Sequence, residues 1–211
     1  ALLDLFKTPV VMLHTSTEWP QQALQTFLKQ HYIDSSLWCC FRRSEWIPRN
    51  FKSNTFEKLR SLTLVRSLIN REIIRAATTL IKVAPNLKFL NISNNFKDIS
   101  TVHLGKFFWE ELLQLKGNFE NLTHLVCQNN ISALRNVHLI AFLHKTPNLE
   151  ILNIDRNRKI FHESSYMLPS GLVLNKLRWL SCEDTDLFHA KGPTVLIEDV
   201  SFPNLSHLSF K

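Results

Sequence analysis

Glycine and cysteine are both scarce in this sequence, and no long stretch of it is continuously apolar. Four glycines in 211 residues lie well below the usual share of about 7%. Rossmann and P-loop folds need glycines where the backbone approaches phosphate groups, so this scarcity argues against both classes. No apolar run approaches the roughly 18–20 residues that a membrane-spanning helix needs. The sequence therefore predicts a protein that does not enter a membrane.

The composition is that of a folded chain. Hydrophobic residues make up 45% of it, phenylalanine occurs 15 times, and the net charge is +7. This is enough apolar material for one large or two small domains with a buried core, and it excludes a disordered chain. The basic excess is spread along the chain instead of gathering in one long run, so the charge by itself does not indicate nucleic-acid binding.

A repeated pattern, L-x-x-L-x-[L/I/C/F], dominates the chain from residue 59 onward. We number its positions from the first leucine. Its six copies are KLRSLTL, NLKFLNI, NLTHLVC, NLEILNI, KLRWLSC and NLSHLSF, and they begin at Leu59, Leu87, Leu122, Leu149, Leu177 and Leu205. Successive starts differ by 28, 35, 27, 28 and 28 residues. Three copies carry asparagine at position nine, where its side chain can bond the backbone as the chain leaves a strand.

This pattern resembles that of the leucine-rich repeat family. The resemblance implies an α/β solenoid with six parallel inner strands in a domain spanning residues 55–211. Outer helices are predicted at Glu72–Val83, His103–Lys116 and Asn136–Lys145, where the periodicity is helical. The second of these should bury Phe107, Leu112 and Leu115. No capping segment follows the sixth strand, so we expect further chain or a partner to cover that end.

Residues 1–54 do not fit the repeat, and we predict an N-terminal helical segment there. Its expected helices are Leu2–Leu13, Pro20–Tyr32 and Ser36–Trp46, with a proline placed to begin the second one. The simplest role for such a segment is to cap the first repeat.

The four cysteines are expected to be free thiols. Cys127 and Cys182 both occupy the inward-pointing position six, two repeats apart. Strand spacing separates their Cα atoms by roughly 9–10 Å, too far for a disulfide. Cys39 and Cys40 are adjacent and are expected to lie away from the inner strands. Free thiols predict a reducing compartment, cytoplasmic or nuclear, although sequons occur at Asn91, Asn121, Asn130 and Asn204.

No arrangement of residues in the sequence indicates catalysis, a metal site or a bound cofactor. The C-x-x-C, H-E-x-x-H, G-x-S-x-G and phosphate-loop motifs are all missing. His124 and Cys127 are three residues apart on a predicted strand, so they should face opposite sides and fail to share a metal ion. We therefore expect a chain that is not an enzyme.

The concave surface of the predicted sheet is the candidate binding site. Positions three, five and seven of each repeat should point toward it, and they bring together aromatic, aliphatic and polar side chains as a protein-binding surface requires. The predicted partner-binding residues are Phe89, Asn91, His124, Gln128, Ile151, Asn153, Asp155, Trp179, Glu183 and His207.

Two further resemblances concern residues 1–54. The stretch WPQQALQTFLKQHYIDSSLWCCFRRSEW is similar to an F-box, and ALLDLFKTPVVML followed by WPQQ is similar to a VHL-box. Both resemblances imply a substrate receptor of a cullin-RING ubiquitin ligase. Such a receptor binds a Skp-type or elongin adaptor, and through it a cullin. The implied adaptor-binding residues are Leu24, Phe27, Leu28, Leu37 and Trp46.

Two alternatives stay open. The segment APNLKFLNISNN is similar to the repeats of mRNA-export receptors, which implies an RNA-export adaptor. The densest basic patch, Arg42, Arg43, Arg49 and Lys52, could contact RNA or an acidic protein surface. A structural scaffold within a larger complex is the other alternative.

Overall fold

An eight-stranded parallel sheet organises the described part of the chain. The computed structural model describes residues 10–14 and 36–40 by their backbone, and most of residues 59–65, 68, 70–96, 101–115, 119–130, 136–157, 172–184 and 200–209 with side chains. The eight strands of the sheet follow sequence order: β1 (Val10–His14), β2 (Ser36–Cys40), β3 (Ser61–Leu64), β4 (Phe89–Asn91), β5 (His124–Val126), β6 (Ile151–Asn153), β8 (Trp179–Ser181) and β10 (His207–Ser209).

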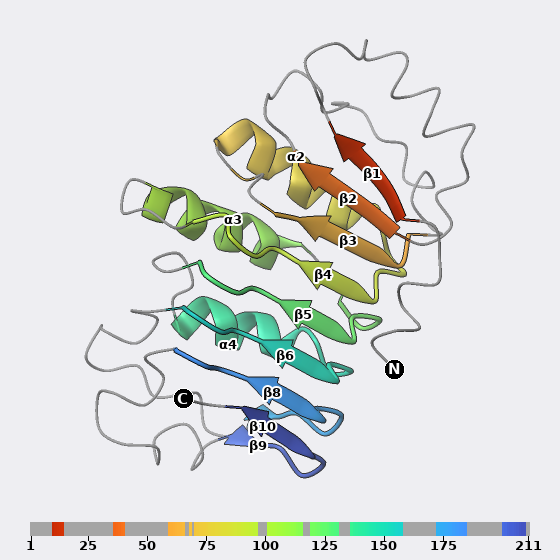
Figure 1. The fold of residues 1–211 in the computed structure, drawn as a ribbon, viewed down its shortest axis with the longest axis vertical. Helices are drawn as coiled ribbons and strands as arrows, with labels where there is room; N and C mark the ends of the chain where they lie inside the picture. The colour runs from red at the N-terminus through yellow and green to blue at the C-terminus, as the bar shows by residue number, and fades with distance from the viewer. Residues whose placement is uncertain are drawn as a thin grey trace.

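Every neighbouring pair in this sheet is parallel and in register. The strands succeed one another along the long axis of the molecule, from β1 to β10 (Figure 1). The chain is therefore an α/β protein, and each of the six predicted repeats contributes a strand where its pattern placed one. A second, two-stranded parallel sheet pairs β7 (Leu172–Val173) with β9 (Val200–Ser201).

The N-terminal prediction was wrong where the structure describes it. β1 lies largely within the predicted helix Leu2–Leu13, and β2 opens the predicted helix Ser36–Trp46. Short apolar runs do not distinguish strand from helix by periodicity, and in β1 the β-branched pair Val10 and Val11 favours a strand. The sheet is continuous across the predicted boundary at residue 54. The predicted helix Pro20–Tyr32 lies outside the described residues.

Three helices lie on one side of the sheet (Figure 1). They are α2 (Arg71–Lys82), α3 (Val102–Gln114) and α4 (Asn136–His144), and they confirm the three helices predicted in the repeats. The side chain of Asn70 caps α2, because its Oδ1 accepts the Ile73 N–H at 2.9 Å. The Lys145 ammonium donates to the carbonyls of Leu113 and Leu115, so a residue that follows α4 satisfies the C-terminal end of α3.

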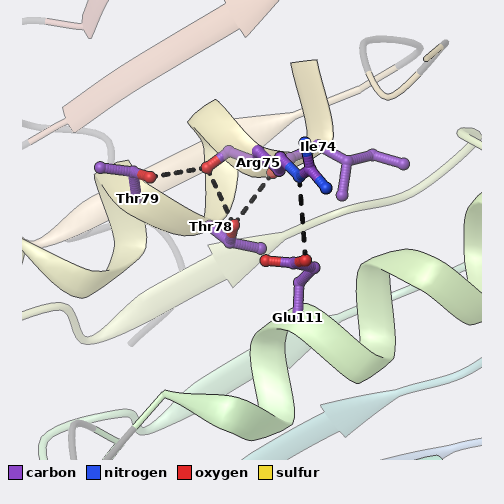
Figure 2. Close-up of polar contacts among 5 residues, drawn as sticks. All are labelled: Ile74, Arg75, Thr78, Thr79 and Glu111. Carbon is purple, nitrogen blue, oxygen red and sulfur yellow. Dashed lines mark hydrogen bonds and ion pairs between the residues drawn. The ribbon is translucent and has the colours of Figure 1, made fainter. Parts of the chain in front are cut away.

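Figure 2 shows hydrogen bonds within α2 and the ion pair between Arg75 of α2 and Glu111 of α3. The hydroxyls of Thr78 and Thr79 donate to carbonyls of their own helix, at 2.7 to 3.1 Å. Arg75 Nε lies 4.0 Å from Glu111 Oε1. The Arg75 side chain is 66% exposed, so this ion pair adds little to stability.

The predicted inner face of α3 is only partly correct. Leu112 is fully buried, but Phe107 and Leu115 are half-buried. The guanidinium carbons of Arg71 and Arg75 lie 5.1 and 5.5 Å from the centre of the Phe107 ring. The deep positions belong instead to Phe108 and Trp109. In a helix with three consecutive aromatic residues, packing against α2 and α4 decides which of them turn inward.

Buried asparagines at position nine join successive repeats. Asn130 Oδ1 accepts the Asn95 N–H at 2.8 Å, and Asn157 Oδ1 accepts the Asn130 N–H at 2.8 Å. The Nδ2 groups of these residues donate backward: Asn130 to Ile92 O at 3.0 Å, and Asn157 to Cys127 O at 2.7 Å. This asparagine ladder (Asn95, Asn130 and Asn157) confirms the expected backbone bonding and satisfies groups that would otherwise be buried unpaired.

A second asparagine row lies at the opposite, exposed ends of the strands, and sequence analysis missed it. Each member precedes the first leucine of its repeat and donates from Nδ2 to a carbonyl of the repeat before. Asn121 reaches Pro85 O at 3.0 Å, Asn148 reaches Glu120 O at 2.6 Å, and Asn204 reaches Asn175 O at 2.6 Å. The recurring Asn-Leu pair was the signal for this row.

Position eight explains how the repeats turn with so few glycines. The residues there have left-handed φ angles: Asn94 at 62°, Asn129 at 53°, Arg156 at 58° and Asp184 at 50°. Asparagine and aspartate tolerate this region because their short polar side chains bond locally, whereas arginine has no such compensation. Arg156 is therefore the strained member of the set.

The described thiols behave as predicted. Cys127 and Cys182 are free and buried. Cys39, however, pairs in register with Leu64, so the expectation that it lies away from the inner strands was wrong. Of the sequons, Asn130 is buried within the ladder, while Asn121 and Asn204 are exposed. Among the described residues, no helix is both long and apolar enough to cross a membrane.

Candidate functional site

The candidate site is the sheet face that carries positions three, five and seven, which we call the open face. In β4, β5, β6, β8 and β10 the position-four residues point to the helix side, and the alternate side chains point to the open face. Strand register aligns positions three and five into rows across the sheet. Row seven is aligned by backbone hydrogen bonds from position eight of one repeat to the carbonyl of position seven in the next. All ten predicted partner-binding residues lie in these three rows.

Row three consists mainly of aromatic and histidine side chains. Phe89 and His124 are neighbours, with ring centroids 6.2 Å apart. Trp179 and His207 stack at 5.5 Å with an interplanar angle of 5°, and Ile151 lies between the two pairs in the strand register. Phe89, Ile151 and Trp179 are half-buried and His207 is exposed. The large side chains therefore pack on one another across the strands and keep part of their surface accessible.

His124 contributes a neutral ring to this row. Its Nδ1 lies 2.7 Å from Thr123 Oγ1. Burial lowers the pKa of His124, and the nearby carboxylate of Glu150 opposes this shift only in part. The ring is therefore uncharged at neutral pH.

Row five holds small side chains, and its asparagines serve their own backbone. Asn91 Oδ1 accepts the N–H of Ser93 at 3.0 Å, and Asn153 Oδ1 accepts the N–H of Asp155 at 3.1 Å. Such Asx turns shape the end of each strand. The two predicted residues Asn91 and Asn153 thus shape the site, and their carbonyl oxygens are already engaged.

Asp155 is the centre of row seven. Its Oδ1 accepts from Ser181 Oγ at 2.6 Å and from the Glu183 N–H at 2.7 Å. Its Oδ2 accepts from Gln128 Nε2 at 3.1 Å. Because charge-assisted bonds of this kind are stronger than neutral ones, the carboxylate is held in one orientation.

The row-seven network extends beyond Asp155 on both sides. Ser93 Oγ accepts the Gln128 N–H at 3.1 Å, and Ser209 Oγ donates to Glu183 Oε1 at 2.5 Å. Sequence analysis places Ser93, Ser181 and Ser209 at positions five and seven, among the polar groups of the predicted surface, but does not include them in the partner-binding residues. Their signal was the placement of hydroxyls beside acidic residues in neighbouring repeats.

The carboxylates of row seven also affect the pKa values of two buried thiols, Cys127 and Cys182. Burial, then the charges of Asp155 and Glu183, raise the pKa of the Cys182 thiol to about 11. Burial and the Asp155 charge also raise the pKa of Cys127. Both thiols are protonated at neutral pH, which makes them unreactive core residues.

The structure also shows where the remaining residues considered in the sequence analysis lie. His124 is half-buried on the open face and Cys127 is buried on the opposite side, so they do not form a metal pair. No group of three or more metal-ligating side chains occurs in the described part of the chain. Of the adaptor-binding residues, Leu37 lies in β2 opposite Leu62. Leu24, Phe27, Leu28 and Trp46 lie outside the described residues.

Compared with known protein families and with curated proteins, the chain matches none.

Proposed function

We propose that this chain is a leucine-rich repeat solenoid that acts as a non-catalytic binding module and holds a protein partner on its open face. The solenoid assignment is supported by the constant strand register and by the asparagine ladder, which repeats the same bonds from β4 to β6. In such repeats each unit contacts only its neighbours, and the uninterrupted sheet face becomes the binding surface.

The observation that carries the proposal is the order of the open face. Aromatic side chains with partial exposure, fixed by contacts with their neighbours, lose little entropy on binding and are the usual anchors of protein interfaces. Trp179 is stacked on His207, and a hydrogen-bonded network holds Gln128, Asp155 and Glu183 nearby. The surface therefore combines apolar anchors with polar groups already in place.

Nucleic acid is a poorer fit to this face. Phosphate binding needs lysine or arginine, and none occurs among the described residues at positions three, five and seven; Lys211, at position seven of the sixth repeat, lies outside them. The basic patch at Arg42 and Arg43 lies outside the described residues, so binding of RNA through residues 41–52 stays a prediction.

The receptor role in a ubiquitin ligase likewise stays a prediction. Its test should not delete residues 1–54, because the deletion removes β1 and β2 and exposes the edge of β3. Alanine substitutions at Phe27 and Leu28 in the full chain test adaptor binding more cleanly. Recovery of a Skp-type or elongin adaptor with the unchanged chain and its loss with these variants is the expected result for a receptor.

Site-specific photo-crosslinking in cell extract tests the binding face. A photoreactive phenylalanine analogue at Ile151 should crosslink a partner protein, and Trp179→Ala should reduce that crosslink. The matched control places the same analogue at Lys106, which is exposed on α3. Equal crosslinking of the same partner from Lys106, or an unchanged yield with Trp179→Ala, would contradict the proposal.

A further inference from the structure

The charge of the open face is opposite in sign to that of the whole chain. The net charge of the chain is +7. Among the described residues at positions three, five and seven there are two carboxylates, Asp155 and Glu183, and no lysine or arginine; Lys211, at position seven of the sixth repeat, lies outside the described residues. His124 adds no compensating charge, because burial lowers its pKa. The negative groups lie at position seven of the neighbouring β6 and β8 repeats, whose position-three residues are Ile151 and Trp179.

These carboxylates are held in place before any partner arrives. Asp155 accepts three hydrogen bonds, one of them from the backbone of Glu183. Ser209 donates to Glu183 from the next strand. A preorganised anion loses little freedom when a cation approaches it, which favours recognition of a positively charged group.

The spacing of the rows selects the shape of the partner. Neighbouring strands lie about 4.8 Å apart, close to the 5.4 Å pitch of an α-helix. A helix lying across β6, β8 and β10 therefore presents about one turn to each strand. Side chains on one face of an extended peptide recur every 6.6–6.8 Å and fall out of step within two strands.

The width of the face also accommodates a helix. Rows three and seven are separated by about 13 Å along the strands, and a helix with its side chains is about 10–12 Å across. Between them row five offers the small side chains of Asn153, Ser181 and Ser209. A helix seated there would have row three on one flank and row seven on the other.

We propose that the open face over β6, β8 and β10 binds a basic amphipathic helix of a partner protein. Apolar residues of the helix pack on Ile151 and Trp179, and lysine or arginine side chains pair with Asp155 and Glu183. This inference rests on the proposed function and specifies the chemistry of the partner.

Synthetic helices serve as probes. The basic probe is an amphipathic peptide of about four turns, made of leucine and lysine with helical period. The acidic probe replaces each lysine with glutamate, and a strand-period probe rearranges the basic composition into strict alternation. Fluorescence anisotropy with the full chain at low salt should give at least tenfold tighter binding of the helical basic probe than of either other probe. Because charge pairing is screened, its affinity should fall as salt is raised.

Variants of the full chain test whether Asp155 and Glu183 bind the basic probe. Glu183→Gln should weaken binding of the basic probe. Glu183→Gln combined with Asp155→Asn should raise the Kd of that probe about three- to tenfold in total. The matched control, Glu72→Gln with Glu110→Gln, removes two exposed charges from α2 and α3 and should leave binding unchanged. The single variant at the exposed Glu183 keeps the test informative if the double variant is poorly folded.

The outcomes separate this inference from the proposed function. Equal binding of the acidic probe, or equal weakening by the control variant, overturns the basic-partner inference. Equal binding of the strand-period probe overturns the helical geometry. If Ile151 still crosslinks a partner and Trp179→Ala still reduces that crosslink, the open face remains a binding surface for a partner of different chemistry.

Discussion

The middle of the sheet and its last strand carry the same sequence pattern in different environments. At position four, Leu90 and Leu125 are fully buried and Leu152 is 3% exposed, whereas Leu208 in β10 is 44% exposed. The asparagine ladder runs through the repeats of β4 to β6. In the last two repeats, β7 and β9 precede the inner strands, and Val173 is 47% exposed.

This difference shows that a repeat does not bury its own leucines. Each strand buries its position-four side chain between two neighbours, whereas in the described part of the chain β10 pairs with β8 alone. The motif therefore predicts the direction of a side chain, and the neighbouring repeat determines how much energy its burial contributes.

Truncating the two equivalent leucines tests this comparison with the largest expected effect. Leu152→Ala should destabilise the protein by about 3 kcal/mol, because it leaves a cavity in a closed core. Leu208→Ala should cost less than about 1 kcal/mol, because its side chain is already half in water. Denaturant unfolding of both variants measures the two costs, and equal values would show that β10 is as enclosed as β6.

The asparagine ladder provides the next test. Asn130→Ala removes the acceptor for the Asn95 and Phe96 N–H groups and the donor to Ile92 O. Because these groups are buried, we expect a loss of about 2–4 kcal/mol in the free energy of unfolding. The control, Asn121→Ala, breaks one exposed bond and should cost less than about 1 kcal/mol. A similar cost for both would mean that burial does not distinguish the two asparagine rows.

Relieving the strain at Arg156 should stabilise the protein, whereas the two preceding substitutions should destabilise it. Arg156 holds a left-handed φ of 58°, which costs a residue with a Cβ about 1–2 kcal/mol. Arg156→Gly relieves this strain but adds freedom to the unfolded chain, so the net expectation is about 0.5–1 kcal/mol of stabilisation. Asp184→Gly, at an exposed aspartate with a left-handed φ of 50°, is the matched control and should be near neutral. Thermal unfolding reports both, and destabilisation by Arg156→Gly would contradict the strain assignment.

The smallest expected effect is that of Asp155, on the open face, on the pKa of the buried Cys182 thiol. With a pKa of about 11, about one in a thousand Cys182 thiols is ionised at pH 8, and alkylation of the folded protein should be slow. Asp155→Asn removes one of the charges that raise this pKa, so the pH profile of alkylation should shift to lower pH. Mass spectrometry of iodoacetamide-treated protein follows Cys182 directly. A profile unmoved by Asp155→Asn would show that the Asp155 charge does not contribute to the raised pKa of Cys182.

The repeated segment was largely predictable. The leucine spacing located all six repeat strands, and helical periodicity located α2, α3 and α4 to within a few residues. Register then aligned the predicted site residues into rows, since parallel strands with one repeated pattern place equivalent positions side by side. The inner face of α3 was harder, because Phe107, Phe108 and Trp109 are consecutive and equally apolar.

The N-terminal strands could not be predicted in the same way. β1 and β2 do not carry the leucine frame, and five-residue apolar runs fit a strand or a helix equally well. Pairing with β3 decides the matter, because an open sheet edge is satisfied by another strand. The resemblance to adaptor-binding boxes placed Leu37 in a helical segment for the same reason.

The sequence by itself determined the repeat, the strand and helix positions within it, and the face on which each strand side chain lies, because these depend on periodicity within one segment. Tertiary structure alone decided which leucines are buried and which hydroxyls hold Asp155. It also decided that the Trp179 ring stacks on His207. Those outcomes depend on contacts between residues about one repeat apart, and the pattern within a single repeat carries no information about its neighbours' side chains.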